Sequence, residues 1–318
     1  MLETINYEEI VKKYPWLVKK DLDCIISPDA DGMLCGLFMS HYLNWRIVGY
    51  YDNGKNLILK KGIHAKDCVF LDTEIYRPEI RSIGHHISLF RKNKTDVDAD
   101  NYKNCLNPNN LRGRTFKEDF SLKYPIGTIH ILLCIVGNKY PIKHLEKSFF
   151  VILQADGAIN RFLDRYSENL REWLLYLGID EKNNILNKII KKDTNLIDIN
   201  KEYVQYVQKF VKTRKDKIPF SERGNLNPSS LNGSRTKFSE SCIATTVEYL
   251  EFLSKNTGWD YKKERWIFDN LVIHEFTKKI VRPGIRTFNK AVAENFLSLA
   301  ITASDSMEYT IEAPDKLP

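Results

Sequence analysis

The stretch Leu22-Asp-Cys-Ile-Ile-Ser-Pro-Asp-Ala-Asp-Gly-Met33 decides the fold expected of this chain. Its apolar first half stops at Pro28, which is the pattern of a short buried strand. A helix should begin near Asp31, because apolar side chains recur on one helical face after it: Met33, Leu34, Leu37, Phe38 and Tyr42. A buried strand that leads directly into a helix is the opening unit of a parallel α/β sheet.

The same alternation continues on both sides of this unit. Further buried strands are predicted at 47–51, 67–72, 83–89 and 149–154, and helices at 7–14 and 124–137. Asn6 should cap the first of these helices, and Pro15 should end it. Residues 91–120 are polar and are expected to form a long loop region. The N-terminal half is therefore predicted to be a parallel sheet flanked by helices.

The pattern of apolar residues changes after residue 162. Helical periodicity dominates the segments 162–177, 181–192, 201–214 and 242–255, with a loop over 218–237. Runs of β type follow at 271–276 and 299–302, together with a short helix after Phe288. We expect an α/β protein with a parallel-sheet domain over 1–175. Residues 176–318 should form a helical connector and a small α+β C-terminal part.

Composition sets the class of protein. The chain has 318 residues, of which 43% are hydrophobic and 28% charged, and this mixture excludes a disordered chain and a coiled coil. Its longest apolar run, 131–136, is far shorter than the roughly 20 residues that cross a bilayer, and the N-terminus has no apolar signal segment. The six cysteines form no C-x-x-C pair, so we expect reduced core thiols in a cytoplasmic protein. The oligomeric state stays open.

The net charge is mildly basic. It amounts to +7, from 48 basic and 41 acidic residues. Such a balance suits an anionic partner such as a nucleic acid, and it suits an ordinary basic enzyme equally well.

Carboxylates stand where the predicted strands end. Asp29 and Asp31 lie between a strand and a helix, at the sheet edge where ligands of parallel α/β proteins bind. Carboxylates at this spacing can hold a divalent cation, although either one can also cap the helix. Asp72 and Asp156 each follow an apolar run, a position that by itself is more common for turn residues.

Two adjacent histidines follow Gly84. His85 and His86 lie in a segment predicted to be a strand, whose geometry would send their rings to opposite faces. One ring can then bind a metal while the other faces solvent or substrate.

The order of these motifs resembles the DHH phosphoesterase superfamily, in its archaeal RecJ-like branch. The resemblance runs from Leu22 to Trp173, with a Gly-His-His triplet where the family has Asp-His-His. Weaker marks of the same branch lie between and after the motifs: Asn104-Cys-Leu-Asn-Pro108, Tyr124-Pro125 with Gly127, and Asp156-Gly157 with Tyr166, Asn169 and Trp173.

The resemblance implies a site with two divalent cations, Mn²⁺ or Mg²⁺. By position, Asp29 would bind the first cation and Asp31 the second, and Asp72 would bridge both. His85 and Asp156 would complete the second cation's ligands. His86 would face the scissile phosphate.

Three features depart from the family pattern. Gly84 replaces the family's Asp, so that another carboxylate has to compensate or the histidines are held more loosely. Ile25 stands where many small-substrate members have a histidine, as in members of the RecJ type. The C-terminal Gly-Gly-Gly-His run is absent. In its place, candidate substrate-binding side chains are the arginines of two glycine-containing segments, although solvated surface arginines fit equally well: Arg223, Arg235, Arg282 and Arg286.

The function expected from this resemblance is a metal-dependent phosphodiesterase or exonuclease. It would hydrolyse single-stranded DNA or RNA, or short oligonucleotides, to mononucleotides, with no membrane involved. One alternative is a phosphatase for a small substrate such as pyrophosphate, a cyclic dinucleotide or a nucleoside bisphosphate. Another is a replication or repair scaffold with weakened catalysis. A haloacid-dehalogenase type, with Asp29 as nucleophile and Asp31 as acid/base, fits Met33 and the histidine pair poorly.

Overall fold

A seven-stranded sheet forms the centre of the structure, a computed structural model that describes residues 4–52, 54–92, 99–145, 148–162, 164–190, 221–222, 225–226, 231–312 and 317. Its strands are β1 (Asp23–Ile26), β2 (Arg46–Tyr51), β3 (Asn56–Lys60), β4 (Val69–Leu71), β5 (Arg81–Ile83), β6 (Cys105–Leu106) and β9 (Leu271–Glu275). They lie in the order β6-β5-β4-β1-β2-β3-β9. The five strands from β6 to β2 are parallel, whereas β3 and β9 are antiparallel to their neighbours. The predicted α/β class with a mainly parallel N-terminal sheet is confirmed.

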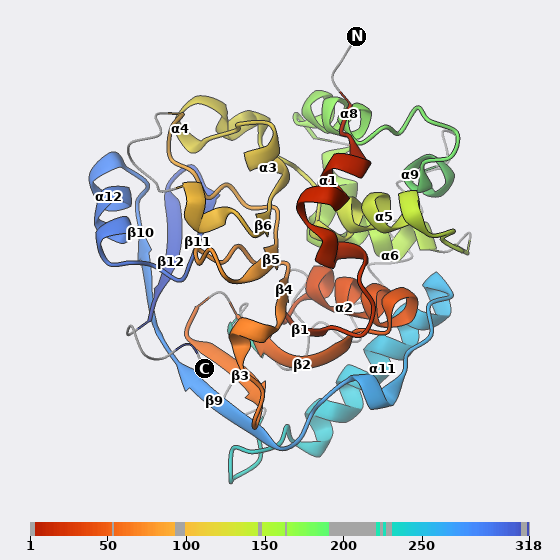
Figure 1. Ribbon diagram of the computed structural model, residues 1–318, viewed down its shortest axis with the longest axis vertical. Helices are drawn as coiled ribbons and strands as arrows, with labels where there is room; N and C mark the ends of the chain where they lie inside the picture. The colour runs from red at the N-terminus through yellow and green to blue at the C-terminus, as the bar shows by residue number, and fades with distance from the viewer. Residues whose placement is uncertain are drawn as a thin grey trace.

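Helices cover one face of this sheet (Figure 1). They are α1 (Tyr7–Lys13), α2 (Ala30–Leu43), α5 (Thr128–Lys139), α6 (Ser148–Gln154), α8 (Ser167–Tyr176), α9 (Ile185–Ile189) and α11 (Glu240–Thr257). Alternate residues of each strand point to opposite faces, so Ile26 and Leu71 pack under the helices while Ile25 and Phe70 pack on the other face. The central helix α2 contacts the sheet, α5 and α11, which explains why it is buried along most of its length.

The ends of the first two helices follow their sequence signals. The Asn6 side chain accepts hydrogen bonds from the backbone N–H groups of Glu8 and Glu9, as predicted. Asp29 caps α2 by accepting from the Gly32 N–H at 3.0 Å. Asn44 ends α2 in the left-handed conformation, with φ of 58°.

A small antiparallel sheet forms the C-terminal part. Its strands are β10 (Thr277–Val281), β11 (Ser298–Ala303) and β12 (Ser306–Ile311), in the order β10-β12-β11, and α12 (Ile285–Ala293) packs with them. The Tyr76 N–H donates to the Leu297 carbonyl at 2.8 Å, and the Ile301 N–H donates to the Ile87 carbonyl at 3.0 Å. Both bonds join this small sheet directly to the loops that follow β4 and β5.

Short elements complete the described chain. They are α3 (Pro108–Leu111), α4 (Phe116–Asp119), α7 (Ala158–Arg161), the strands β7 (Ser221–Glu222) and β8 (Asn225–Leu226), and the 3-10 helices η1 (Pro15–Val18), η2 (Ala65–Asp67), η3 (Ala99–Tyr102), η4 (Phe120–Leu122), η5 (Ala155–Gly157) and η7 (Lys263–Arg265). Residues 99–122 therefore contain ordered elements and are not the continuous loop expected from their polarity.

Two predicted strands are wrong. The apolar run at 149–154 is the helix α6, since a buried run of this length suits either structure. The strand expected at 83–89 is instead β5 (Arg81–Ile83), which ends before the histidine pair. The helix expected at 181–192 is reduced to α9, and the one at 201–214 lies outside the described residues.

The domain boundary near residue 175 stays a prediction. Strand β9, from the second predicted domain, pairs with β3 in the sheet of the first. Among the described residues, no helix is both long and apolar enough to cross a membrane. All six cysteines are buried thiols.

Candidate metal centre

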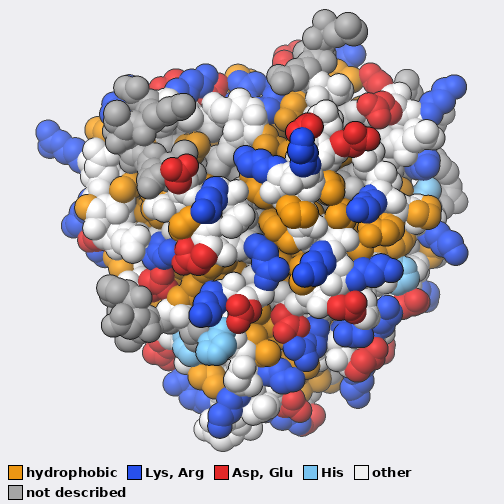
Figure 2. Space-filling model, in the orientation of Figure 1, with side chains coloured by type: hydrophobic (Ala, Val, Ile, Leu, Met, Phe, Trp, Pro, Cys, Tyr) orange, Lys and Arg blue, Asp and Glu red, His pale blue; other side chains and the backbone are white. Residues whose placement is uncertain are grey.

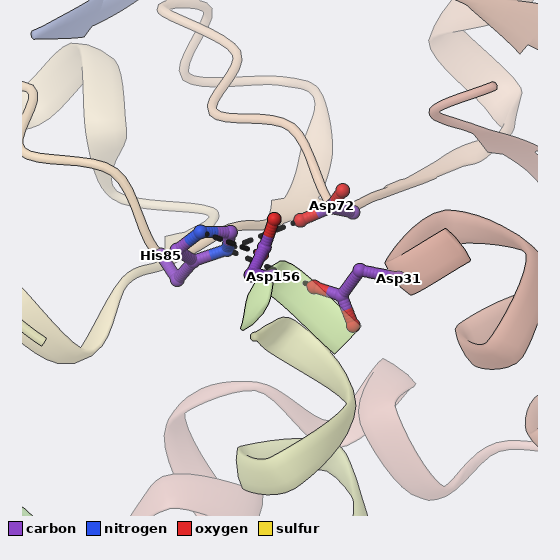
Figure 3. A group of neighbouring side chains, drawn as sticks. All are labelled: Asp31, Asp72, His85 and Asp156. Atoms are coloured by element: carbon purple, nitrogen blue, oxygen red, sulfur yellow. Dashed lines mark hydrogen bonds and ion pairs between the residues drawn. The ribbon is translucent and has the colours of Figure 1, made fainter. Parts of the chain in front are cut away.

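Four acidic and imidazole side chains meet at one edge of the large sheet (Figure 3). Asp31 lies at the start of α2, Asp72 follows β4, His85 follows β5, and Asp156 lies in η5. One ligand atom from each side chain lies within 4.8 Å of the others. Asp31, Asp72 and His85 are buried, and Asp156 is half-buried.

The sheet topology explains this convergence. β1, β4 and β5 are adjacent parallel strands, so the residues that follow them meet at the same edge. Asp156 reaches the group from the turn between α6 and α7, and not from a strand end as predicted. Asp72 and Asp156 have left-handed backbone conformations, with φ of 63° and 52°. Such conformations are uncommon outside glycine and concentrate at functional sites.

Asp31 is held by the N-terminus of α5. Its carboxylate accepts from the Thr128 N–H at 2.5 Å and from the Ile129 N–H at 3.0 Å. Gly127 permits this approach, because a Cβ there would lie 2.8 Å from the carboxylate atoms of Asp31. Burial, followed by the negative charges of Asp72 and Asp156, raises the pKa of Asp31 well above its ordinary value.

Asp72 is bound by two hydroxyl groups. The Thr128 hydroxyl donates to its Oδ1 at 2.7 Å, and the Ser27 Oγ lies 2.6 Å from its Oδ2. Ser27 Oγ also lies 2.8 Å from Asp29 Oδ1. A hydroxyl has a single hydrogen, so Ser27 can satisfy only one of the two carboxylates at a time. The Ser27 hydroxyl therefore joins the Asp29 and Asp72 carboxylates without donating to both at once.

His85 lies among the carboxylates. Its Nδ1 is 3.0 Å from Thr128 Oγ1 and 3.2 Å from Asp72 Oδ1, and its Nε2 is 2.9 Å from Asp156 Oδ2. Burial alone would lower the pKa of His85, but the Asp156 and Asp72 carboxylates outweigh it and raise this pKa. For Asp72, burial is likewise outweighed by the hydrogen bond from His85, so the pKa of Asp72 is lowered.

This set of donors fits a divalent cation. Three carboxylates and one imidazole are the oxygen and nitrogen ligands typical of Mn²⁺ and related ions. A cation would also offset the charge repulsion that raises the pKa of Asp31. When the proton of His85 is on Nδ1, Thr128 Oγ1 can accept it, which leaves the Nε2 lone pair beside Asp156. The cluster could therefore hold a metal ion.

Asp29 lies next to this cluster without belonging to the group of four. It is half-buried, caps α2 and is connected to Asp72 through the Ser27 hydroxyl. Its role as a ligand of a first cation stays a prediction.

The histidine rings do not point to opposite faces. The centroids of the His85 and His86 rings are 4.3 Å apart, and the rings are stacked at 30°. The prediction of opposed rings is wrong because β5 ends before the pair. The His86 ring borders an adjoining cleft.

That cleft has a volume of about 410 Å³. It lies between the histidine pair, the segment before α5, the region around α7 and the turn between β11 and β12. Its lining residues are His85, His86, Phe120, Ser121, Lys123, Tyr124, Pro125, Asp156, Arg161, Tyr166, Asn169, Thr302, Ala303 and Ser304. Five residues of the RecJ-like marks are among them: Tyr124, Pro125, Asp156, Tyr166 and Asn169.

Two cationic side chains of the cleft were missed by sequence reasoning. Lys123 is half-buried, and burial, followed by the charge of Arg161, lowers its pKa to about 8. Arg161 is ion-paired with Asp164 at 2.9 Å. Both are close to residues of the weaker family marks, since Lys123 precedes Tyr124 and Arg161 is the last residue of α7, five residues after Asp156. Glu74, two residues after Asp72, was also missed.

The predicted substrate arginines lie elsewhere. Arg235 is ion-paired with Glu275 at 2.8 Å, and Arg282 and Arg286 are exposed and do not line this cleft. Arg223 is outside the described residues. Their role in substrate binding stays a prediction. On the face shown in Figure 2, Lys and Arg side chains are interspersed with Asp and Glu and do not form one continuous basic stripe.

Comparisons with known proteins add no family. A scan against protein-family models, a search of curated proteins and a search of solved structures found no match to the chain.

Proposed function

We propose that this protein is a divalent-metal-dependent hydrolase of phosphoric esters, related to the DHH phosphoesterases. The observation that carries the proposal is the convergence of Asp31, Asp72, His85 and Asp156 at the end of a cleft that also contains Lys123 and Arg161. Metal ligands beside fixed positive charges are the arrangement that phosphoryl transfer requires.

Each part of the site has a chemical role in this proposal. Mn²⁺ or Mg²⁺, when bound, would polarise the phosphoryl oxygen and lower the pKa of a coordinated water. The four cluster residues would hold the cations, with Asp29 available beside Asp72 through Ser27. His86 would orient the scissile phosphate from the cleft wall. Lys123 and Arg161 would attract the phosphate groups of the substrate.

The cleft favours a short substrate or a strand end over a long internal segment. Its volume of about 410 Å³ is in the lower part of the range of roughly 300–1,000 Å³ found for small-ligand sites. Phe120 and Tyr166 line the cleft, and cations lie over both rings: Lys123 over Phe120 at 4.5 Å, and Arg161 and Arg165 over Tyr166 at 5.3 and 5.0 Å. A base that stacks on either ring has to displace these cations or use the opposite ring face. We therefore propose exonucleolytic release of mononucleotides from single-stranded nucleic acid or short oligonucleotides. The same volume also suits a small-substrate phosphatase, which is the second candidate.

A substrate panel tests the proposal and separates the two candidates. The purified protein is incubated with Mn²⁺, Mg²⁺ or a chelator and offered end-labelled single strands, duplex, dinucleotides and pyrophosphate, with the Asp72→Asn variant as control. We expect metal-dependent release of mononucleotides from single strands and dinucleotides, with duplex a poor substrate. Faster cleavage of pyrophosphate than of any strand selects the phosphatase. No metal-dependent hydrolysis of any of these substrates refutes the proposal.

A further inference from the structure

A buried carboxylate lies behind the histidine pair. Glu74 is only 2% exposed. Its Oε1 accepts from the His86 backbone N–H at 2.6 Å and from Asn107 Nδ2 at 3.3 Å. Its Oε2 lies 3.4 Å from Nδ1 of the His86 ring. Both oxygens of one side chain are therefore directed at His86 and its surroundings.

The position of Gly84 explains how this carboxylate fits. A Cβ at residue 84 would lie 2.3 Å from Oε1, 2.5 Å from Cδ and 3.0 Å from Oε2 of Glu74. Gly84 has no positive φ, so its backbone would accept another residue, and only the lack of space requires glycine. By standard bond lengths, the carboxylate oxygens of an Asp lie about 2.4 Å from its own Cβ. The Glu74 carboxylate therefore occupies the space that a side chain at residue 84 would need.

Two asparagines complete the support of the histidine backbone. Asn107 Nδ2 donates to the His86 carbonyl at 2.7 Å, and Asn109 Nδ2 donates to the His85 carbonyl at 2.7 Å. Together with Glu74, these side chains hold the backbone N–H of His86 and both carbonyls of the pair. Glu74 comes from the loop after β4, and the two asparagines come from the start of α3, which follows β6, so the pair is held by segments that follow the strands on each side of β5.

We infer that Glu74 is a positioning residue that orients His86 toward the cleft, in place of a side chain at residue 84. A carboxylate 3.4 Å from Nδ1 favours the tautomer with its proton on Nδ1, which leaves Nε2 as the nitrogen available to a substrate. The role of His86 in orienting a phosphate rests on the proposed function. The pairing of Glu74 with Gly84 does not.

Removing the carboxylate at residue 74 and introducing one at residue 84 tests the inference. Glu74→Ala should lower kcat by about 10- to 100-fold, the usual effect of losing an outer partner of a site residue, and change KM by less than about threefold. In the double variant Glu74→Ala/Gly84→Asp, kcat should recover at least about tenfold, whereas Glu74→Ala/Gly84→Asn should not recover, because Asn has the shape without the charge. Equal kcat in the Asp and Asn variants overturns the inference.

A matched control separates positioning from simple loss of stability. Glu312 is another carboxylate with a buried side chain, ion-paired with Arg77 at 2.6 Å, and it neither lines the cleft nor belongs to the cluster of four. Glu312→Ala should reduce the melting temperature without changing kcat at a temperature where the variant is folded. A fall in kcat equal to that of Glu74→Ala would show that any buried carboxylate has this effect, and would overturn a specific role.

Two further measurements do not depend on activity. Gly84→Ala should lower the melting temperature in the wild-type background and have little effect in Glu74→Ala, since the colliding carboxylate has been removed. At one fixed pH, the ¹⁵N shifts of the His86 ring should report a proton on Nδ1 in the wild type and a changed tautomer in Glu74→Ala. Additive melting temperatures, or unchanged shifts, overturn the inference even if no hydrolysis is found. If the melting temperatures and the ring shifts change as expected but the protein hydrolyses none of the substrates, only the proposed function is refuted.

Discussion

Gly127→Ala provides a sharp test of how Asp31 is held. Gly127 precedes α5 with φ of −73° and ψ of 166°, a conformation open to alanine, so the substitution introduces no backbone strain. Its new Cβ would lie 2.8 Å from Cγ, Oδ1 and Oδ2 of Asp31. Asp31 is fully buried, so its carboxylate has no solvent to move into. The methyl group must therefore displace the carboxylate or the start of α5.

The magnitude follows from the contacts that would be lost. Asp31 accepts two backbone hydrogen bonds, at 2.5 and 3.0 Å, each worth about 1 kcal/mol net. Overpacking of a buried site adds about 1–3 kcal/mol. We expect a loss of about 3–5 kcal/mol in the free energy of unfolding, which lowers the melting temperature by about 5–8 °C for a chain of this size. Affinity for Mn²⁺ should fall by about 10- to 100-fold, because Asp31 loses its support.

Gly137→Ala is the matched control in the same helix. The nearest atoms to a Cβ there are side-chain carbons of Ile142 and Ile185 at 3.3 Å or more. The change should leave stability unchanged or improve it by up to about 1 kcal/mol through helix propensity. Thermal unfolding in chelator and calorimetric titration with Mn²⁺ measure both effects. For a chain of this size, about 1 kcal/mol moves the melting temperature by roughly 2 °C. If the melting temperatures of Gly127→Ala and Gly137→Ala differ by less than this, the described contact between residue 127 and Asp31 is refuted.

Four other predictions follow from the site and its surroundings. Asp72→Asn should lower kcat/KM by more than about 100-fold, because a metal ligand is lost. The melting temperature in chelator should change little, because removing one of several neighbouring carboxylates reduces their mutual repulsion. Activity within about tenfold of wild type would contradict the metal hypothesis. Lys123 has a pKa of about 8 and is charged only below it, so KM for a phosphorylated substrate should rise as pH increases through 8; in Lys123→Arg this rise should disappear. Burial lowers the pKa of His130 to about 4 from 6.5, so between these pH values the unfolded chain binds a proton that the folded chain does not. The folded state should therefore lose about 3 kcal/mol of stability as the pH falls from 6.5 to 4. Urea unfolding at several pH values should show this loss, and a smaller loss in His130→Leu. If Arg282 and Arg286 contact a bound strand, replacing both with Ala should flatten the log–log salt dependence of binding by about 1.4, measured by fluorescence anisotropy with Asp31→Ala protein; an unchanged slope removes both from the binding surface.

The sequence was most informative where structure is local. The strand before Pro28, the helix after it and the cap at Asn6 all follow from short apolar patterns and known end signals. The position of Asp31 and Asp72 after parallel strands indicates a common sheet edge, whereas the grouping of His85 with them came only from the resemblance to the DHH phosphoesterases. Asp156 reaches the same group from the end of α6, a helix that the sequence predicts as a strand.

The features that were missed depend on contacts between distant residues or on space. A short apolar run such as 149–154 fits a buried helix as well as a buried strand. The pairing of β3 with β9 links segments with no shared local pattern. The relation between Glu74 and Gly84 is steric, so neither residue alone signals it. Lys123 acquires its lowered pKa only when the chain buries it near Arg161.

Strand β9 is translated long after its partner β3, and this has a consequence for synthesis of the chain. Its partner β3 ends at Lys60 and β9 begins at Leu271, so about 210 residues must be translated between them. At about 5–20 residues per second, this takes roughly 10 to 40 s. During that time the outer edge of β3, with its apolar Leu57, Ile58 and Leu59, has unpaired backbone groups that can template association with other chains. Yield in a cell should therefore depend on translation speed through this interval and on chaperones that cover the growing chain.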